Sequence, residues 1–221
     1  MVRLFSYYYV IAAILLMPLS ASAINQKGDS MTNIRNIKHA IQPLQTLVIE
    51  EYSPAYQDQV GDLIVTVQTA YGVKKPDGSP ITIKDQPDLE NIANFYQQGT
   101  YGPGSFLIAR KDSIVIGTAA LVNIGNQQAV LRKMFVCKDH EGQGIAKKLL
   151  HSLVLWAQAN GIKEILLGTI EKTFIGAVGM YKKKYGFEPI DKDKLPTNFP
   201  IMSVDDIFLV SSVDKLLEKF A

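Results

Sequence analysis

The strongest constraint in the sequence is a glycine-containing turn between a strand-like run and a helical pattern. The apolar run ends at residues 131–136, and Gly142 and Gly144 follow with one residue between them. From Ile145 onward the apolar residues recur at helical spacing, at positions 149, 150, 153, 154 and 157. Such a turn points several backbone N–H groups at one spot, and the helix behind it begins with unpaired N–H groups that carry partial positive charge. We therefore expect an anion site that suits phosphate.

The spacing of the glycines excludes two common phosphate motifs. A dinucleotide fingerprint needs glycine where Lys147 stands, and a P-loop needs Gly-Lys-Ser/Thr after a longer gap between its glycines. The stretch instead resembles the pyrophosphate loop of the GNAT family of N-acetyltransferases, whose pattern is Arg/Gln-x-x-Gly-x-Gly/Ala. The corresponding residues are Glu141, Gly142, Gln143, Gly144, Ile145 and Ala146. Gly144 and Ala146 match the pattern, and Glu141 does not.

Flanking segments extend the resemblance over residues 46–211. Residues 163–169 resemble the family's next strand, and residues 114–121 resemble its third strand. The family's Ala-x-x-x-Tyr…Gly-Phe signature has a counterpart here, in one face of a predicted helix and the first residues of the strand after it. Its residues are Phe174, Ala177, Tyr181, Gly186 and Phe187.

The resemblance implies an α/β fold with a mixed, mostly antiparallel twisted sheet flanked by helices, the GNAT-like acyl-CoA N-acyltransferase fold. It also implies transfer of acetyl from acetyl-CoA to a primary amine of unknown identity by direct attack. The pantetheine would pair with the backbone of Met134, Phe135 and Val136, a backbone N–H of this stretch would face the oxyanion, and the pyrophosphate would lie on the amides from Glu141 to Ala146. Tyr181 would protonate the leaving thiolate.

Three departures from the family pattern affect this reading. Glu141 places a carboxylate beside the expected pyrophosphate, and Phe174 stands where many members have a cofactor-contacting asparagine. Tyr181 lies five positions before Gly186, whereas the family usually has four, and one extra residue rotates a helical position by ~100°. The sequence identifies no general base, although Glu50, Glu51, Tyr101, His140 and Glu171 have suitable chemistry.

Composition argues against two other classes of site. The 23 basic and 21 acidic residues leave a net charge of +2, which is not the clustered basic charge of a nucleic-acid-binding surface. Cys137 is the only cysteine, and the three histidines are scattered at positions 39, 140 and 151. We therefore expect neither an intramolecular disulfide nor a metal site.

The first 23 residues have the layout of a targeting segment. Arg3 precedes an apolar run at 4–19, and a small-residue triplet ends at Ala23. The segment is expected to act as a cleaved signal peptide or as a membrane anchor, and residues 24–45 as a linker before a catalytic domain at 46–221. An exported enzyme would lack cytosolic acetyl-CoA, so the alternative is a true start at Met31, and the localisation stays open between these readings.

The remaining pattern predicts a short-link antiparallel meander followed by alternating helices and strands. Strands are expected at 46–50, 106–110, 114–123, 129–136 and 163–169, after Gly186, and near 204–210. Helices are expected after Ser53-Pro54, at 87–98, behind the glycine turn, around 174–181 and at 214–220. Two other functions remain open, namely a catalytically decayed acyl-CoA-binding module and a membrane-held interaction protein that keeps only the fold.

Overall fold

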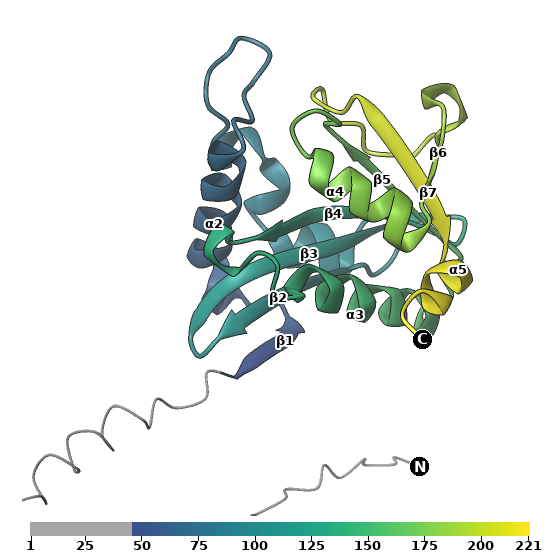
Figure 1. Ribbon diagram of the computed structural model, residues 1–221, viewed down its shortest axis with the longest axis horizontal. Coiled ribbons are helices and arrows are strands. Elements are labelled where there is room, and N and C mark those ends of the chain that lie inside the picture. Colours follow the sequence, from purple (N-terminus) through teal and green to yellow (C-terminus); the bar gives the residue numbers. More distant parts are fainter. Residues whose placement is uncertain (1–45) are drawn as a thin grey trace, which may run out of the picture. The chain divides into compact units, whose positions relative to one another are not determined.

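The computed structural model describes residues 46–221. The expectations for the targeting segment at 1–23 and the linker at 24–45 lie outside the described residues. Seven strands form one sheet in the order β1-β2-β3-β4-β5-β7-β6 (Figure 1). Their bounds are β1 Leu47–Glu51, β2 Ser105–Lys111, β3 Ile114–Gly125, β4 Gln128–Val136, β5 Glu164–Thr169, β6 Glu188–Pro189 and β7 Ile207–Ser212.

The sheet is mixed and mostly antiparallel, which confirms the predicted fold class. β1 to β4 form the expected meander, and the two pairs that β7 makes with β5 and β6 are also antiparallel. β4 and β5 alone are parallel among the strands described, because α3 carries the chain back across the sheet between them. The strand expected after Gly186 has only two residues, and the last strand begins at Ile207 rather than near 204, because a turn closed by the Asp205 N–H and the Met202 carbonyl occupies the preceding residues.

The helices are mostly short. The α-helices are α2 Gln57–Ala70, α3 Ile145–Ala159, α4 Ile175–Gly179 and α5 Val213–Glu218, and the 3-10 turns are η1 Pro54–Tyr56, η2 Ile83–Asp85, η3 Pro87–Leu89, η5 Lys138–His140 and η7 Lys192–Lys194. Two segments, η4 Ala93–Gln98 and η6 Met180–Lys184, have π geometry. Within residues 46–221, none of the helices is long and apolar enough to cross a lipid bilayer.

Two helix predictions need correction. The single helix expected at 87–98 is a 3-10 turn followed by a π segment. The Asn91 side chain accepts a hydrogen bond from the Asn94 N–H, and this bond interrupts the helix between the two elements. Its predicted inner residues Leu89, Ile92 and Tyr96 are nevertheless fully buried. The apolar residues at positions 60, 63, 64, 67 and 71 predict one inner face of the first helix, but Tyr71 is 40% exposed, because it lies just past the end of α2.

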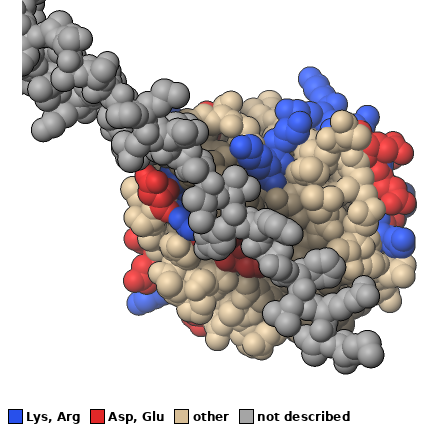
Figure 2. Space-filling view, turned by 90° about the horizontal axis from the view of Figure 1, so that it is seen from below, with Lys and Arg blue, Asp and Glu red and all other residues tan. Residues whose placement is uncertain are grey.

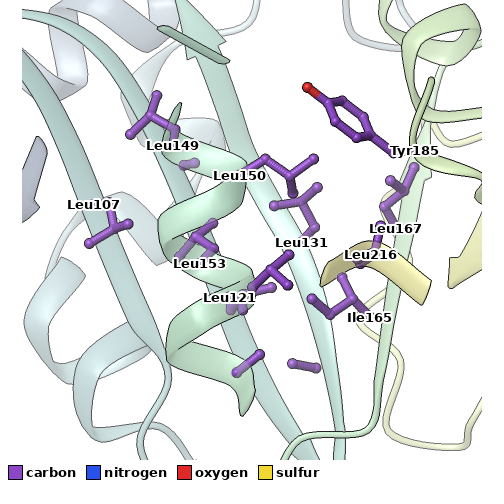
Figure 3. Packing of buried hydrophobic residues seen from close by; sticks show 14 of the residues in the cluster. Leu107, Leu121, Leu131, Leu149, Leu150, Leu153, Ile165, Leu167, Tyr185 and Leu216 are labelled. Atoms are coloured by element: carbon purple, nitrogen blue, oxygen red, sulfur yellow. The ribbon is translucent and has the colours of Figure 1, made fainter. Parts of the chain in front are cut away.

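The helices cover both faces of the sheet. Figure 1 shows α3 and α4 on one side, where α3 supplies Leu149, Leu150 and Leu153 to the largest apolar cluster. These side chains point toward the strands, and the ring of Tyr185 closes one end of the cluster (Figure 3). On the other face α2 and the 87–98 segment bury Ile64, Leu89, Ile92 and Tyr96 against β2 and β3. A third, smaller apolar cluster is formed by Ile124, Val130, Leu166, Phe199 and Phe208.

Charged side chains are distributed over the surface in small groups. On the face seen in Figure 2, basic side chains form a strip near the top, acidic groups lie mainly toward the left and right edges with basic side chains beside them, and uncharged surface fills much of the area between. This view agrees with the near balance of 23 basic and 21 acidic residues in the whole chain.

A buried polar network joins the 87–98 segment to β4. Lys133 Nζ lies 3.2 Å from an Asp88 carboxylate oxygen and donates to Gln86 Oε1 at 2.6 Å. Arg132 approaches the same carboxylate to 3.7 Å, and the Tyr96 hydroxyl donates to it. Burial lowers the pKa of Lys133 to about 8 against the attraction of Asp88, whereas the pKa of Asp88 stays below its ordinary value because the cations and hydrogen bonds outweigh burial.

The π segment accommodates the extra residue between Tyr181 and Gly186. The N–H of Tyr185 donates to the carbonyl of Met180, five residues back, so this turn holds one residue more than an α-helical turn. Lys182, Lys183 and Lys184 are exposed on it, whereas Tyr181 and Phe187 are buried and pack edge to face with ring centroids 5.5 Å apart. The ~100° rotation expected from the extra residue is thus absorbed, and Tyr181 keeps its inward orientation.

The network predicts a large stability loss for Asp88→Asn, because Lys133 and Arg132 would lose their only carboxylate partner in the described structure. The free energy of unfolding should fall by about 3–5 kcal/mol in urea titrations, as is typical when one member of a buried ion pair is removed. The control is Asp191→Asn, whose partner Lys194 is largely exposed, and it should leave the urea midpoint unchanged. A loss no larger in Asp88→Asn than in the control would contradict this account.

The π segment predicts tolerance to a deletion. Removing Lys183 should convert the wide turn into an ordinary α turn without disturbing the core, so the free energy of unfolding should change by less than about 1 kcal/mol. Deleting the buried Val178 instead should shift Tyr181 out of register and cost more than about 2 kcal/mol. Equal losses in the two deletion variants, measured by thermal and urea unfolding, would show that the π turn does not absorb the extra residue.

Candidate active site

The main feature of the site is an opening between β4 and β5. The two strands pair only through Gln128, Ala129 and Val130 of β4 with Glu164, Ile165 and Leu166 of β5. Beyond these three pairs β4 continues to Val136 and β5 to Thr169 without pairing to each other. The β4 edge that faces the opening therefore presents backbone groups without a strand partner, and this edge can bind an extended ligand by adding a strand.

A bulge in β4 turns the strand at the opening. The register with β3 jumps from Ala120↔Arg132 to Thr118↔Phe135, so two residues of β4 stand opposite one residue of β3. Lys133 has a left-handed φ of 51°, which is unfavourable for a side chain of this size. The Thr118 hydroxyl donates to the Lys133 carbonyl at 2.7 Å and helps to hold the bulge.

The glycine turn at the end of β4 has the geometry that the sequence predicts. Gly142 and Gly144 have φ values of 73° and 78°, and Gly144 is the N-cap of α3. The Lys148 N–H donates to the Gly144 carbonyl at 3.1 Å, and this is the first hydrogen bond of α3. The N–H groups of residues 145–147 therefore have no backbone acceptor among residues 46–221. A Cβ on Gly144 would meet open space. This end of the opening can therefore receive an anion.

Two residues that sequence reasoning missed contact the turn. The Tyr71 hydroxyl donates to the Glu141 carboxylate at 2.7 Å, and Lys111 Nζ donates to Gln143 Oε1 at 3.0 Å. Tyr71 follows α2 and Lys111 ends β2, so neither carries a local signal that connects it to the turn. The Tyr71 ring also packs on Phe174 with centroids 5.4 Å apart, and Phe174 faces Phe135 at 6.4 Å. This row of aromatic rings crosses the opening.

Two cavities meet at the opening from opposite faces of the sheet. The cavity on the α4 face has a volume of ≈ 110 Å³ and is lined by Met134, Leu167, Ala177 and Tyr181 among others. The cavity on the other face has a volume of ≈ 140 Å³ and is lined by the chain around residues 199–205 and by residues between α2 and η3. Their shared lining, which includes Arg132, Lys133, Phe135 and Phe174, shows that they adjoin.

Tyr181 lies in the cavity on the α4 face, as predicted for its helix position. It is 5% exposed, and its hydroxyl has no hydrogen-bond partner among residues 46–221. Burial, and to a smaller extent the neighbouring Tyr185, raises the pKa of its phenol far above the ordinary value. The hydroxyl therefore keeps its proton at neutral pH and is free to donate it into the cavity.

The general-base candidates named from the sequence do not line either cavity at the opening. Glu50 is paired with Arg110 at 2.5 Å, and Glu51 accepts from the Ser105 hydroxyl at 2.7 Å. Tyr101 faces a separate groove, and His140 and Glu171 lie outside both cavities. Within the described part of the chain, no group of three or more His, Cys, Asp or Glu side chains is arranged to hold a metal ion.

Comparison with known proteins agrees with this geometry. The family model described as "Acetyltransferase (GNAT) family" matches residues 72–187. A GNAT acetyltransferase structure from Staphylococcus aureus Mu50 is 32% identical, with a TM-score of 0.68, over 76% of this chain and 99% of its own. The PaiA N-acetyltransferase from Thermoplasma acidophilum, solved with coenzyme A, is 17% identical with a TM-score of 0.53 over the same shares and supports the fold.

The curated relatives are similar over a shorter stretch. The rat protein named N-acetyltransferase family 8 member 2 is 29% identical over 102 residues, which are 44% of this chain and 43% of that protein. The match thus spans less than half the length of the curated relative. The family model, by contrast, covers more than half of the present chain and includes the opening, the glycine turn and Tyr181. The chain belongs to the GNAT family of acetyltransferases.

Proposed function

We propose that this protein transfers an acetyl group from acetyl-CoA to a primary amine by direct attack of the amine on the thioester. The observation that carries this proposal is the opening between β4 and β5 with the anion-binding turn at its end. A long donor with an extended amide-containing arm and a pyrophosphate fits this combination of an unpaired strand edge and free helix amides. The Thermoplasma acidophilum neighbour, which shares the fold, was solved in complex with coenzyme A, and this supports a coenzyme A donor here.

The donor would be held mainly by backbone groups. Met134, Phe135 and Val136 would pair with the pantetheine through the β4 edge that β5 leaves free. The pyrophosphate would lie on the amides of the turn, over Gly142 and Gly144, where the open space beside Gly144 leaves room for it. Glu141, Gln143, Ile145 and Ala146 complete the turn.

Glu141 weakens the anion site and is partly compensated. Its carboxylate would repel a pyrophosphate at close range, since like charges disfavour each other. The Tyr71 hydroxyl donates to this carboxylate, and Lys111 brings a positive charge to Gln143 on the same turn. We infer a donor affinity lower than that of a family member with arginine or glutamine at this position.

The chemistry needs a polarised carbonyl and a proton for the leaving group. The amine nitrogen forms a bond to the acetyl carbon, and a backbone N–H of the β4 bulge would stabilise the oxyanion. The carbon–sulfur bond then breaks, its electron pair leaves with sulfur, and the Tyr181 hydroxyl supplies the proton to the thiolate. The buried and protonated state of Tyr181 supports this role.

Acetyl-CoA binding and turnover over a panel of primary amines test the proposal. Acetyl-CoA at 100 times its dissociation constant should stabilise the native protein by about 2.7 kcal/mol, and thiol release should require both donor and amine. Gly144→Glu should stay folded and lose both signals, because its carboxylate would enter the anion site. The matched control is Gly161→Glu at the other end of α3, which has a similar φ of 73° and equally open surroundings.

The alternatives expected from the sequence give different outcomes in the same measurements. Binding without turnover of any amine would identify a decayed acyl-CoA-binding module. No binding at all would leave a protein that keeps only the fold and would refute the proposal. If Gly161→Glu also lost acetyl-CoA binding, the assignment of the glycine turn as the pyrophosphate site would be wrong.

Tyr181→Phe tests the proton donor separately. Removing only the hydroxyl should lower turnover by roughly 10²–10⁴-fold, the range of a positioned general acid, and should leave acetyl-CoA affinity nearly unchanged. The control is Tyr185→Phe, whose buried hydroxyl also has no partner among residues 46–221 but does not line either cavity. That variant should keep its turnover and be at least as stable as the wild type. Equal turnover in the two variants would return Tyr181 to a packing role.

A further inference from the structure

The cavity opposite Tyr181 contains one carboxylate that is not used elsewhere. Lys133 and Arg132 line this cavity, and both form ion pairs with Asp88, at 3.2 and 3.7 Å. Arg132 also donates to the Met202 sulfur at 3.0 Å. Asp85 also lines it, yet its carboxylate caps Thr82 and pairs with Lys75 at 3.2 Å. Asp205 forms no ion pair within 4.0 Å among residues 46–221, and the only hydrogen bond that its carboxylate accepts in this region is from the Met202 N–H at 3.1 Å.

The position of this carboxylate is defined by a glycine in β5. A Cβ on Gly168 would come within 2.6 Å of Asp205 Oδ2 and 2.9 Å of its Cγ. Gly168 borders both cavities at the opening, so Asp205 lies directly against the edge of β5 where the two strands separate. A side chain at position 168 would displace the carboxylate from this edge.

The two faces of the opening therefore carry different proton-transfer groups. Tyr181 lines only the cavity on the α4 face, and Asp205 lines only the cavity on the opposite face. The amine attacks from one face of the thioester carbonyl, and the thiolate leaves from another position around the same carbon, so the reaction can use a base and an acid at separate places. The opening supplies one such group on each of its faces. The cavity that contains Asp205 is accordingly the acceptor side.

We propose that Asp205 is the catalytic carboxylate that binds the ammonium group of the acceptor and removes its proton. This inference rests on the proposed acetyl transfer and names its base. Asp205 takes one proton from the ammonium, and the freed lone pair forms the bond to the acetyl carbon. As the carbon–sulfur bond breaks, Tyr181 protonates the thiolate, and the second amine proton restores the Tyr181 hydroxyl. The net products are an N-acetyl amine, the free thiol and one proton that Asp205 releases to solvent.

The surroundings of Asp205 favour this role. Burial raises the pKa of its carboxyl, the neighbouring Asp206 raises it further, and Arg132 of β4 opposes the rise. Lys133 and Asp85 are the other charged groups of the same cavity, and each has its own partner. A raised pKa makes the carboxylate a stronger base.

The cavity also indicates the kind of acceptor. Its volume is ≈ 140 Å³, and its lining includes the apolar side chains of Val73, Ile81, Phe199 and Met202. A primary amine at the end of an unbranched alkyl chain fits this lining. An α-amino acid fits less well, since its own carboxylate would lie next to Asp205.

Asp205→Asn is the test, with Asp206→Asn as the matched control that makes the same change in charge one residue away. Asparagine can still accept the Met202 N–H, so the variant should fold with a thermal midpoint close to that of the wild type. In the full-length chain, kcat/KM for a linear alkylamine at pH 7 should fall by roughly 10²–10⁴-fold in Asp205→Asn, with acetyl-CoA affinity unchanged. Asp206 is exposed, and its carboxylate accepts a hydrogen bond from the Glu171 N–H. The kcat/KM of Asp206→Asn should stay within a few-fold of the wild-type value.

A pH profile and a second variant separate a base from a structural residue. In the wild type, kcat/KM should fall at low pH as Asp205 becomes protonated, and this fall should be absent in Asp205→Asn. The kcat/KM of the variant should recover in part at high pH, because the amine then loses its proton to solvent. Gly168→Ala should displace the carboxylate and raise KM for the amine while acetyl-CoA still binds. A folded Asp205→Asn with wild-type rate and acidic limb would overturn the role of Asp205 and leave the acetyl transfer standing, whereas a wild type that acetylates no amine would overturn both.

Discussion

β4 and β5 run parallel but share only three residue pairs, and everything on either side of them is arranged around the place where they separate. A fully paired sheet would leave no unpaired strand edge in the middle of the molecule. The early end of pairing gives an extended ligand access to main-chain groups that elsewhere in the sheet are satisfied by neighbouring strands. It also connects the two faces of the sheet, since a cavity opens on each side of the same gap.

The strain at the bulge is held by contacts that come from outside β4. Lys133 in a left-handed conformation costs on the order of 1–2 kcal/mol. Its carbonyl is bonded by Thr118, and its ammonium, only 5% exposed, is bonded by Asp88 and Gln86. The polar network that fills the space under the opening thus also supports the backbone shape that produces the opening, which is how strained sites usually persist.

The sequence predicts those parts of the structure that depend on local patterns. The glycine turn, the buried face of α3 and the inward position of Tyr181 follow from spacing along one segment. The pairs Tyr71 with Glu141 and Lys133 with Gln86 lie 70 and 47 residues apart, and no periodicity connects them. The π turn escaped prediction because hydrophobic spacing does not distinguish a helix with one extra residue from a helix whose face has rotated.

Residues of the acceptor side were missed for a related reason. The base candidates that the sequence offers are Glu50, Glu51, Tyr101, His140 and Glu171. Asp205 instead comes from a turn just before the last strand, and its position against Gly168 places it at the opening. Gly168 appears in the sequence as an ordinary interruption of a strand. The pairing of β5 with β7 places the residues before β7 beside β5. Only this arrangement explains why position 168 is a glycine, since a side chain there would collide with Asp205.

Burial affects the two proposed proton-transfer groups in the same direction and gives them opposite roles. It raises the pKa of the Tyr181 phenol, which therefore holds its proton until a thiolate of sufficient basicity forms beside it. It also raises the pKa of the Asp205 carboxyl, which therefore takes a proton more readily than an exposed aspartate. One physical cause, the loss of contact with bulk water in the two cavities at the β4–β5 opening, thus strengthens the base on one face and keeps the phenol on the other face protonated while making it a weaker acid. The direction of proton flow across the opening follows from which residue type stands on which face.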